Sequence, residues 1–326
     1  MKAILPAPPG GPEVLRLGET KEPLLGPGEL LIAVKAAGVN RADLMQRDGV
    51  YPPPAGVSDI LGLEVAGTVV NCGPRVRGWQ VGDRAMALVA GGGYAEFVAA
   101  PAAQCIPVPE SFSWAQAGAT MEVMLTAWQS LGRRGGLRPG ERVLIHAAGS
   151  GVGTAAIQVA HELGARTVIA TSRSAEKLEI PARLGATPLV VRDGTFADGV
   201  LGHTDGDGVD VILDLVGAAY LAENVRCLAR GGRLILVGLV GGRRAELDLA
   251  ALLPKQATIS AMTVRGLTAT EKGELVASFT EWGLSRLSDG RLTPIVEQEF
   301  PLADAAEAHR LLESNGVVGK VVLRVG

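Results

Sequence analysis

The residues with the clearest chemistry lie in LIHAAGSGVGTAAIQVA (144–160), where an apolar run ends at a histidine and three glycines fall within five positions. The apolar spacing after the glycines is typical of a helix, so the stretch predicts a strand, a tight turn and a helix N-terminus. Free backbone N–H groups and the helix dipole make such an N-terminus an anion site. Small side chains in the turn let a pyrophosphate approach the backbone.

The turn departs from the G-x-G-x-x-G pattern of dinucleotide sites, whose register falls here on Ala148, Ser150 and Gly153. Alanine and serine still leave the approach open, and Ser150 adds a hydroxyl donor. The alternative is an ordinary glycine turn that binds nothing. The strands and helices that follow favour a dinucleotide, and we expect it to contact Ala148, Ser150, Gly151, Val152 and Gly153.

The end of the next expected strand decides which dinucleotide the site favours. NAD sites place Asp or Glu roughly 20 residues after the glycines, where the carboxylate holds the ribose 2′-hydroxyl. Here the chain reads VIATSRSAEK (168–177), with no acid at the strand end. Cations and hydroxyls suit a 2′-phosphate instead, although each could be an ordinary surface residue. The sequence therefore favours NADP, held by Arg173, Ser174, Lys177 and Arg192.

Alternating strands and helices surround the glycine turn. Apolar runs predict strands at 142–147, 166–171, 188–191, 210–214 and 233–237, with helices at 151–163, 174–184 and 219–229. This alternation is typical of a doubly wound parallel sheet, and its ligands bind at the carboxyl ends of the strands. Pro181 should kink or shorten its helix.

The two ends of the chain have different patterns from this central segment. Residues 1–120 are rich in strands and turns, and GVYPPPAGV (49–57) must be a loop because its prolines lack backbone donors. A helical pattern begins after Ser113 in SWAQAGATMEVMLTAWQSL. After about 265 we expect helices at 270–288 and 303–314 and a last strand at 319–325. This tail is too short for a domain of its own, so we expect it to pack on another part of the chain.

Bulk composition limits the function classes. A chain of 326 residues suggests about two domains. The net charge of −3, without any block of like charges, argues against nucleic-acid and anionic-membrane binding. Three widely spaced cysteines fit a reducing compartment, and no signal peptide or membrane-spanning run is apparent. We expect a cytoplasmic protein.

Several long motifs resemble the quinone oxidoreductase branch of the medium-chain dehydrogenase/reductase superfamily, especially its p53-inducible subgroup. They include NRADLMQRDGVYPPP, ILGLEVAGTV, GDRAMALVAGGGYAEFV, MLTAWQSL and GERVLIHAAGSGVGTAAIQ. The resemblance covers almost the whole chain. It implies a GroES-like catalytic domain formed by 1–122 and 265–326, a Rossmann NADP-binding domain over 123–264, NADPH in the cleft between them, and a homodimer.

The same resemblance gives the phosphate turn the form A-x-x-G-x-G, carried by Ala148, Gly151 and Gly153. It also matches the 2′-phosphate residues expected above, with two departures. Arg173 stands where many relatives have glycine, and Arg192 replaces a frequent tyrosine. Both changes add positive charge, so the preference for NADP should survive.

Zinc is the metal to consider, because the superfamily includes zinc alcohol dehydrogenases. Where those enzymes have a cysteine ligand this chain has Asn40, and their Gly-His-Glu is here Gly62-Leu63-Glu64. Leucine cannot ligate, and the cysteine-rich structural lobe is absent. A catalytic zinc needs three protein ligands, so we expect no metal and expect Glu64 to pair with a nearby donor.

Without a Lewis acid, the chemistry must rely on the cofactor and on a donor to the oxygen that gains charge. The candidates for this donor are Asn40 and Tyr51. The alternative is a structural role, in which Asn40 caps a turn and Tyr51 anchors a loop. Further cofactor contacts are expected at Met124 and Thr126, which match family positions lining the nicotinamide, at the ends of the fourth and fifth strands of the parallel sheet, and just before the last strand. The full set of these contacts is Met124, Thr126, Gly217, Gly238, Leu239 and Asn315.

These features predict an NADPH-dependent quinone oxidoreductase without zinc. A reductase of α,β-unsaturated ketones or aldehydes would use the same fold and cofactor, and the sequence does not separate the two. A third possibility, from another class, is a crystallin-like or RNA-binding protein that retains NADPH affinity. The mild acidity of the chain argues against RNA as its main partner.

Overall fold

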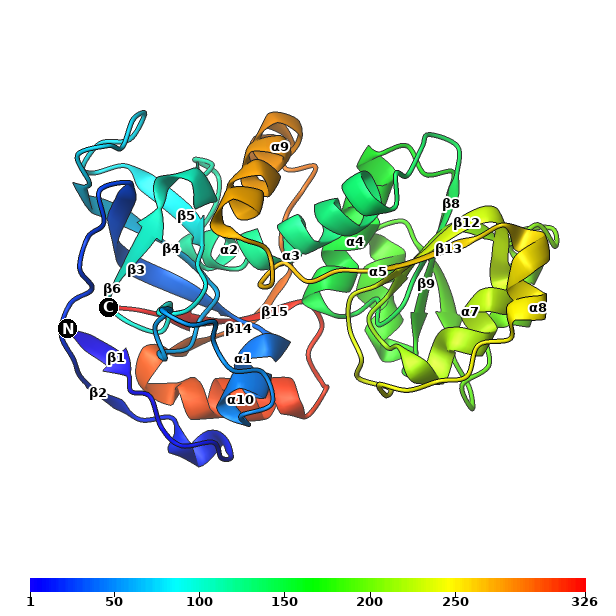
Figure 1. The fold of residues 1–326 in the computed structure, drawn as a ribbon, viewed down its shortest axis with the longest axis horizontal. Helices are drawn as coiled ribbons and strands as arrows, with labels where there is room; N and C mark the ends of the chain where they lie inside the picture. The colour runs from blue at the N-terminus through cyan, green and yellow to red at the C-terminus, as the bar shows by residue number, and fades with distance from the viewer. The chain divides into compact units, whose positions relative to one another are not determined.

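The computed structural model describes residues 1–326, which divide into two compact units (Figure 1). One unit, here called the split unit, consists of Met1–Leu125 and Arg265–Gly326. The other, the parallel-sheet unit, is the continuous segment Thr126–Val264. None of the helices is both long and apolar enough to cross a membrane.

The split unit is built on a seven-stranded sheet that both ends of the chain complete. Its strand order is β14-β15-β3-β4-β5-β7, and β6 also pairs with β3. The strands are β3 (Glu29–Val39), β4 (Glu64–Cys72), β5 (Arg84–Leu88), β6 (Phe97–Pro101), β7 (Cys105–Pro107), β14 (Val296–Pro301) and β15 (Lys320–Arg324). A separate ribbon pairs β1 (Lys2–Ile4) with β2 (Leu17–Glu19).

The last strand, β15, shows why the C-terminal tail cannot stand alone. It lies antiparallel to β3, with Val321 opposite Val39, and parallel to β14. Its residues 320–323 are all buried. Burial of this apolar strand between two others confirms the expectation that the tail packs on another part of the chain, and Figure 1 shows the red C-terminal segment running within the sheet of the split unit.

Helices cover this sheet. They are α1 (Arg41–Arg47), α2 (Trp114–Gly118), α9 (Ala269–Ser288) and α10 (Ala305–Glu313), with short 3₁₀ turns at 12–14, 102–104 and 302–304. The segment 49–57 contains no helix or strand, as its prolines require.

The parallel-sheet unit contains six strands in the order β10-β9-β8-β11-β12-β13, all parallel. Counted along this unit, the order is 3-2-1-4-5-6, which is that of dinucleotide-binding sheets. The strands are β8 (Arg142–Ile145), β9 (Thr167–Ser172), β10 (Thr187–Val190), β11 (Val209–Asp214), β12 (Leu228–Leu236) and β13 (Thr258–Ala261).

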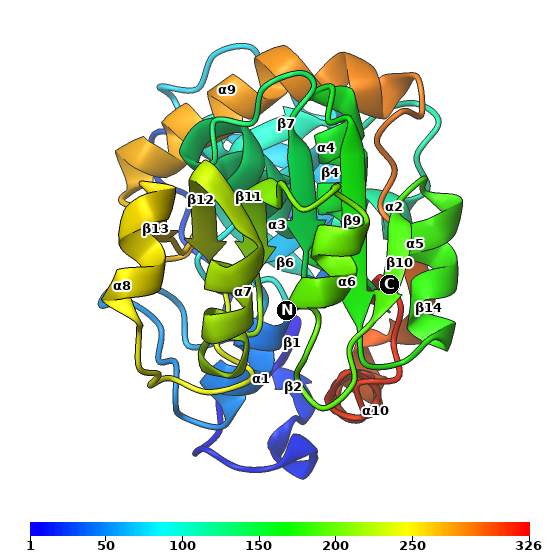
Figure 2. The same ribbon diagram turned by 90° about the vertical axis from the view of Figure 1, so that its right-hand side faces the viewer.

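Helices connect these strands on both faces of the sheet. They are α4 (Gly151–Glu162), α5 (Glu179–Arg183), α6 (Ala197–Gly202), α7 (Leu221–Cys227) and α8 (Leu249–Leu252), with 3₁₀ turns at 176–178, 218–220 and 253–255. Figure 2 shows α6 and α7 in front of the sheet. Phe196, Val200 and Tyr220 bury their apolar surface against Leu144 and Ile212 there.

Three differences separate the structure from the sequence-based elements. The pattern after Ser113 forms α2, then α3 (Met121–Ala127), then a π-helical stretch at Trp128–Arg134. The helix expected at 174–184 is limited to a 3₁₀ turn and α5, because Pro181 can stand only near a helix start. Finally, several short elements were not predicted, among them α1, α6, α8 and β13, since their short segments carry weak periodicity.

A buried polar chain crosses the split unit. Tyr94 donates through its hydroxyl to Asp43 Oδ2 at 3.2 Å, and the hydroxyl oxygen of Tyr94 also lies 3.2 Å from His309 Nε2. Burial and the charge of Arg47 lower the pKa of His309 to about 3, so the ring is neutral at pH 7. Arg47 contacts its Nδ1 at 3.4 Å, so Nε2 carries the proton and donates to Tyr94.

Removing the Tyr94 hydroxyl should therefore leave two buried groups with fewer partners. We expect Tyr94→Phe to lower the free energy of unfolding by about 1–3 kcal/mol, the range for an unsatisfied buried polar group. Chemical denaturation measures this. The matched control is Tyr51→Phe, because Tyr51 is only half-buried and its hydroxyl has no hydrogen-bond partner. Equal losses in both variants would contradict the assignment.

Candidate functional site

The glycine turn lies between β8 and α4, at the N-terminus of that helix. Ser150 is the N-cap of α4, and its Oγ accepts from the N–H of Gly153 at 3.1 Å. The N–H groups of Gly151 and Val152 precede the first intrahelical acceptor, as at any helix start. A Cβ at Gly153 would lie 2.6 Å from the Ala147 carbonyl oxygen and from Ala148 Cα, so only glycine allows this close packing.

Two of the expected cations follow the ends of neighbouring strands. Arg173 comes directly after β9, and Arg192 comes two residues after β10. The two strands pair in register, with Val190 opposite Ser172, so both arginines leave the same edge of the sheet. Both are exposed. Ser174 is half-buried, and its N–H donates to Ser172 Oγ at 3.2 Å.

Lys177 lies against the glycine turn itself. An ideal Cβ on Gly149 would come within 2.9 Å of the Lys177 carbonyl oxygen and 3.2 Å of its Cβ. The structure thus brings the turn and the three cationic residues to the carboxyl-end edge of β8, β9 and β10. No acidic residue ends β9, because Thr171 and Ser172 occupy that place.

A buried chain of polar side chains, which sequence reasoning missed, joins these strand ends. His146 Nδ1 lies 2.7 Å from Thr171 Oγ1, and His146 Nε2 lies 2.7 Å from Asn224 Oδ1. Asn224 Nδ2 donates to Asp214 Oδ2 at 3.0 Å. Burial lowers the pKa of His146, so the ring is neutral, accepting from Thr171 and donating to Asn224. In the sequence, His146 marked only the end of the apolar run before the glycines.

Asp214 carries this chain on to the loop after β11. Its Oδ1 accepts from the N–H groups of Val216 at 2.6 Å and Gly217 at 2.9 Å. Gly217 has φ +85°, a conformation that favours glycine. A Cβ at Gly238 would lie 2.6 Å from the Leu215 carbonyl oxygen, and the adjacent Leu239 is 52% exposed. The expected contacts at Gly217, Gly238 and Leu239 therefore come together in one pair of loops.

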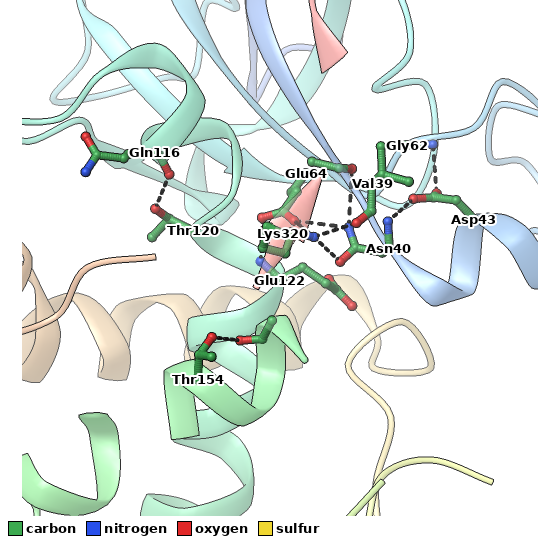
Figure 3. A network of polar contacts seen from close by, with 12 residues as sticks. Val39, Asn40, Asp43, Gly62, Glu64, Gln116, Thr120, Glu122, Thr154 and Lys320 are labelled. Carbon is green, nitrogen blue, oxygen red and sulfur yellow. Dashed lines mark hydrogen bonds and ion pairs between the residues drawn. The ribbon is translucent and has the colours of Figure 1, made fainter. Parts of the chain in front are cut away.

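In the split unit, Asn40 lies at the centre of a buried charged network (Figure 3). It is the N-cap of α1, and its backbone N–H donates to Asp43 Oδ2 at 2.8 Å. Its Oδ1 accepts from Lys320 Nζ at 2.5 Å, and its Nδ2 donates to Glu64 Oε1 at 3.0 Å. A second Nδ2 contact, to the Gly38 carbonyl oxygen, is long at 3.4 Å. One amide proton is therefore weakly held.

Lys320 and Glu64 fix that amide in one orientation. Their charged atoms lie 2.8 Å apart, and the side chains are 4% and 0% exposed. Lys320 also donates to the Val39 carbonyl oxygen at 2.8 Å, while Glu64 Oε2 accepts from the Glu122 N–H at 2.9 Å. The expectation that Glu64 pairs with a nearby donor is thus confirmed. A lysine opening an otherwise apolar strand was the available signal for Lys320.

Tyr51 belongs to the same unit but to a different cluster. Arg265 stacks over its ring, with the guanidinium carbon 4.9 Å from the ring centre, and donates to its carbonyl oxygen at 3.3 Å. Arg265 also donates to Gln46 Oε1 at 2.5 Å. This arrangement anchors the proline-containing loop and leaves the Tyr51 hydroxyl available as a donor.

The remaining predicted contacts differ in their exposure. Met124 is fully buried and Thr126 is 5% exposed, with its carbonyl oxygen accepting from Ser130. Asn315 is exposed, and its Oδ1 accepts from Arg41 at 2.7 Å. Met124 and Asn315 are in the split unit and Thr126 is in the parallel-sheet unit. Within its own unit, neither Met124 nor Asn315 belongs to the Asn40 network.

Comparison with known proteins agrees with this architecture. Residues 26–110 match the alcohol dehydrogenase GroES-like domain, and residues 151–281 match the family described as zinc-binding dehydrogenase. The quinone oxidoreductase of Rattus norvegicus is 31% identical, over 99% of this chain and 97% of its own length. The chain therefore belongs to the medium-chain dehydrogenase/reductase superfamily, in its quinone oxidoreductase-like branch.

Other similar proteins include one segment of a much longer protein and two solved structures. A phenolphthiocerol/phthiocerol polyketide synthase of Mycobacterium tuberculosis is 35% identical over 97% of this chain, but the chain spans only 14% of that protein. A mycobacterial structure complexed with NADPH is 35% identical, covers 99% of this chain and all of its own, and has a TM-score of 0.90. The CurK enoyl reductase is 27% identical, covers 100% and 99%, and has a TM-score of 0.85.

The zinc in that family description can be tested against the residues present. Both Glu64 oxygens already have donors, one of them an ammonium group, and the neighbouring Asn40 and Leu63 supply no thiolate or imidazole. No three His, Cys, Asp or Glu side chains of the chain are grouped to hold a metal ion. The residues therefore do not fit a zinc ion.

The buried ion pair makes a clear energetic prediction. Lys320→Met would leave Glu64 charged and buried, so we expect the free energy of unfolding to fall by about 3–5 kcal/mol. Equilibrium denaturation of Lys320→Met, Glu64→Gln and the double variant forms a cycle. The double variant should lose less than the sum of the single losses, since contacting residues couple. Additive losses would show that the pair has no net coupling.

Proposed function

We propose that the protein is an NADPH-dependent quinone oxidoreductase that works without zinc. The observation that carries the cofactor assignment is the grouping of the glycine turn with Arg173, Lys177 and Arg192 at one sheet edge that lacks an acid. The NADPH complex of a similar mycobacterial protein supports it. Full-length similarity to a quinone oxidoreductase supports the acceptor class.

In this proposal the residues of the parallel-sheet unit bind and orient the cofactor. The turn N–H groups of Gly151 and Val152 donate to the pyrophosphate, as helix N-termini do. Arg173, Ser174, Lys177 and Arg192 hold the 2′-phosphate. The loops at Gly217 and Gly238 offer backbone to the nicotinamide riboside. NADPH, once bound, supplies the hydride equivalent that the side chains cannot.

The split unit contains the groups that we assign to the acceptor. We assign the weakly held Nδ2 proton of Asn40 and the hydroxyl of Tyr51 as donors to the oxygen that gains charge during reduction. The Lys320–Glu64 pair keeps the Asn40 amide from rotating, so its nitrogen faces one way. A donor held in place before the reaction stabilises charge without reorganising.

The cofactor assignment predicts a loss specific to NADPH. A hydrogen bond to a charged group contributes about 1.5–3 kcal/mol, so Lys177→Ala should raise the KM for NADPH about tenfold or more and leave the KM for NADH unchanged. Steady-state kinetics with 1,2-naphthoquinone measures both. Lys21→Ala, at an exposed lysine of the split unit, is the control. Equal use of NADH by the wild type would sink the phosphate assignment.

An enone reductase is the second candidate function. The similarity to an enoyl reductase, and to a segment of a polyketide synthase, favours it specifically. The same assay with an α,β-unsaturated ketone in place of the quinone separates the two. Turnover of the enone alone would replace the quinone assignment without disturbing the cofactor site.

We further propose that the protein is a homodimer that pairs through the parallel-sheet unit. Strand β13 ends that sheet with an unpaired edge, and beside it Leu249 is 63% and Leu253 is 75% exposed. An open strand edge beside exposed leucines favours association with another copy. Light scattering should give twice the chain mass, and Leu253→Glu should shift it toward one chain. A monomeric wild type would end the proposal.

A further inference from the structure

One carboxyl group near Asn40 makes no contact with the network around that residue (Figure 3). Glu122 is the second residue of α3, and its backbone N–H donates to Glu64 Oε2 at 2.9 Å. Its half-buried carboxyl group has neither a hydrogen bond nor an ion pair. In Figure 3 its side chain extends toward the Asn40 side of the network, and no dashed line reaches its oxygens.

Charged groups from four elements face Glu122. They are Glu64 on β4, Lys320 on β15, Asp43 on α1 and Lys272 on α9. Burial and then the negative charge of Glu64 raise the pKa of Glu122 to about 8, against the pull of the two lysines. Lys320, paired with Glu64 at 2.8 Å, lowers the pKa of Glu122, but burial and the charge of Glu64 outweigh that effect.

The position of Glu122 works against the stability of the fold. A carboxyl group taken out of water without a partner is unfavourable, and a second carboxylate close by adds repulsion. Groups that are unfavourable for folding and displaced in pKa gather at functional sites. The two other buried acids here, Asp43 and Glu64, are different because hydrogen bonds satisfy their oxygens.

Reduction of a quinone or an enone needs a proton as well as a hydride. The hydride adds two electrons to the acceptor and leaves an oxyanion, either a hydroquinone monoanion or an enolate. We propose that Glu122 is the catalytic acid of the proposed reductase, delivering its carboxyl proton to the reduced acceptor held by Asn40. The O–H bond of Glu122 breaks, a bond from that proton to the acceptor forms, and solvent water reprotonates the carboxylate.

The inference rests on the proposed function, and Glu122→Gln tests it with little change in shape. For the wild type, kcat should fall as the pH rises through about 8, because the protonated form is the active one. Glu122→Gln should lose about 100-fold or more in kcat and show no such limb, since it cannot donate an acidic proton. The matched control is Glu110→Gln, at an exposed glutamate of the same unit, which should keep the wild-type profile.

A second measurement separates catalysis from structure. The folded state raises the pKa of Glu122 from 4.5 to about 8. The neutral carboxyl group therefore contributes to the stability of the fold fully below about pH 4.5, and this contribution is lost as the pH rises through about 8. The Tm of Glu122→Gln should therefore equal or exceed that of the wild type at pH 9, with the difference shrinking toward pH 5. Loss of activity together with unchanged or higher Tm supports the assignment.

The other possible outcomes contradict either the role of Glu122 alone or the proposed function as well. If the wild type is active and Glu122→Gln has the same kcat and pH profile, Glu122 is not the catalytic acid, and the proposed function still stands. A lower Tm at every pH shows that Glu122 is structural and also overturns it. A wild type that reduces neither acceptor with NADPH overturns the proposed function and this assignment together.

Discussion

The buried ion pair of Lys320 and Glu64 is the constraint on which the split unit depends. It joins the first residue of the last strand to the first residue of β4, which are far apart in the chain. Two charges removed from water are unfavourable unless each is satisfied completely. Here the ammonium has three acceptors and the carboxylate has three donors, including the Asn40 amide and the N–H of Glu122 in the first turn of α3. The requirement for full satisfaction therefore sets the position of Asn40, α3 and β15 at once.

The parallel-sheet unit contains a second network of buried polar side chains. The ends of three strands are linked by Thr171, His146, Asn224 and Asp214, and the last of these holds the Gly217 loop. Because His146 is kept neutral by burial, the chain has a fixed direction of donation. The loops at this edge thus have rigid supports although they carry few large side chains. A backbone surface of this kind suits a dinucleotide, whose phosphates require close approach.

Local patterns predicted much of the fold. The glycine turn, the strands of the parallel sheet and the GroES-like and Rossmann pairing followed from periodicity, from small residues near Gly153, and from family resemblance. Short elements such as β13 escaped because a four-residue strand carries little periodicity. The supports of the site escaped for a different reason. His146 and Asn224 are 78 residues apart, and Lys320 and Asn40 are 280 apart, so no local pattern connects them.

The placement of β15 has a consequence for how the protein is made. The parallel-sheet unit is one continuous segment, so a growing chain can complete its sheet soon after residue 264 leaves the ribosome. The other sheet lacks an inner strand until residues 320–324 emerge. Until then the β3 edge at 36–39 is open, and the carboxylate of Glu64 has no lysine beside it. The part of the chain synthesised before the parallel-sheet unit is therefore the last to reach its native structure, and the nascent protein must keep that edge from other strands during the interval.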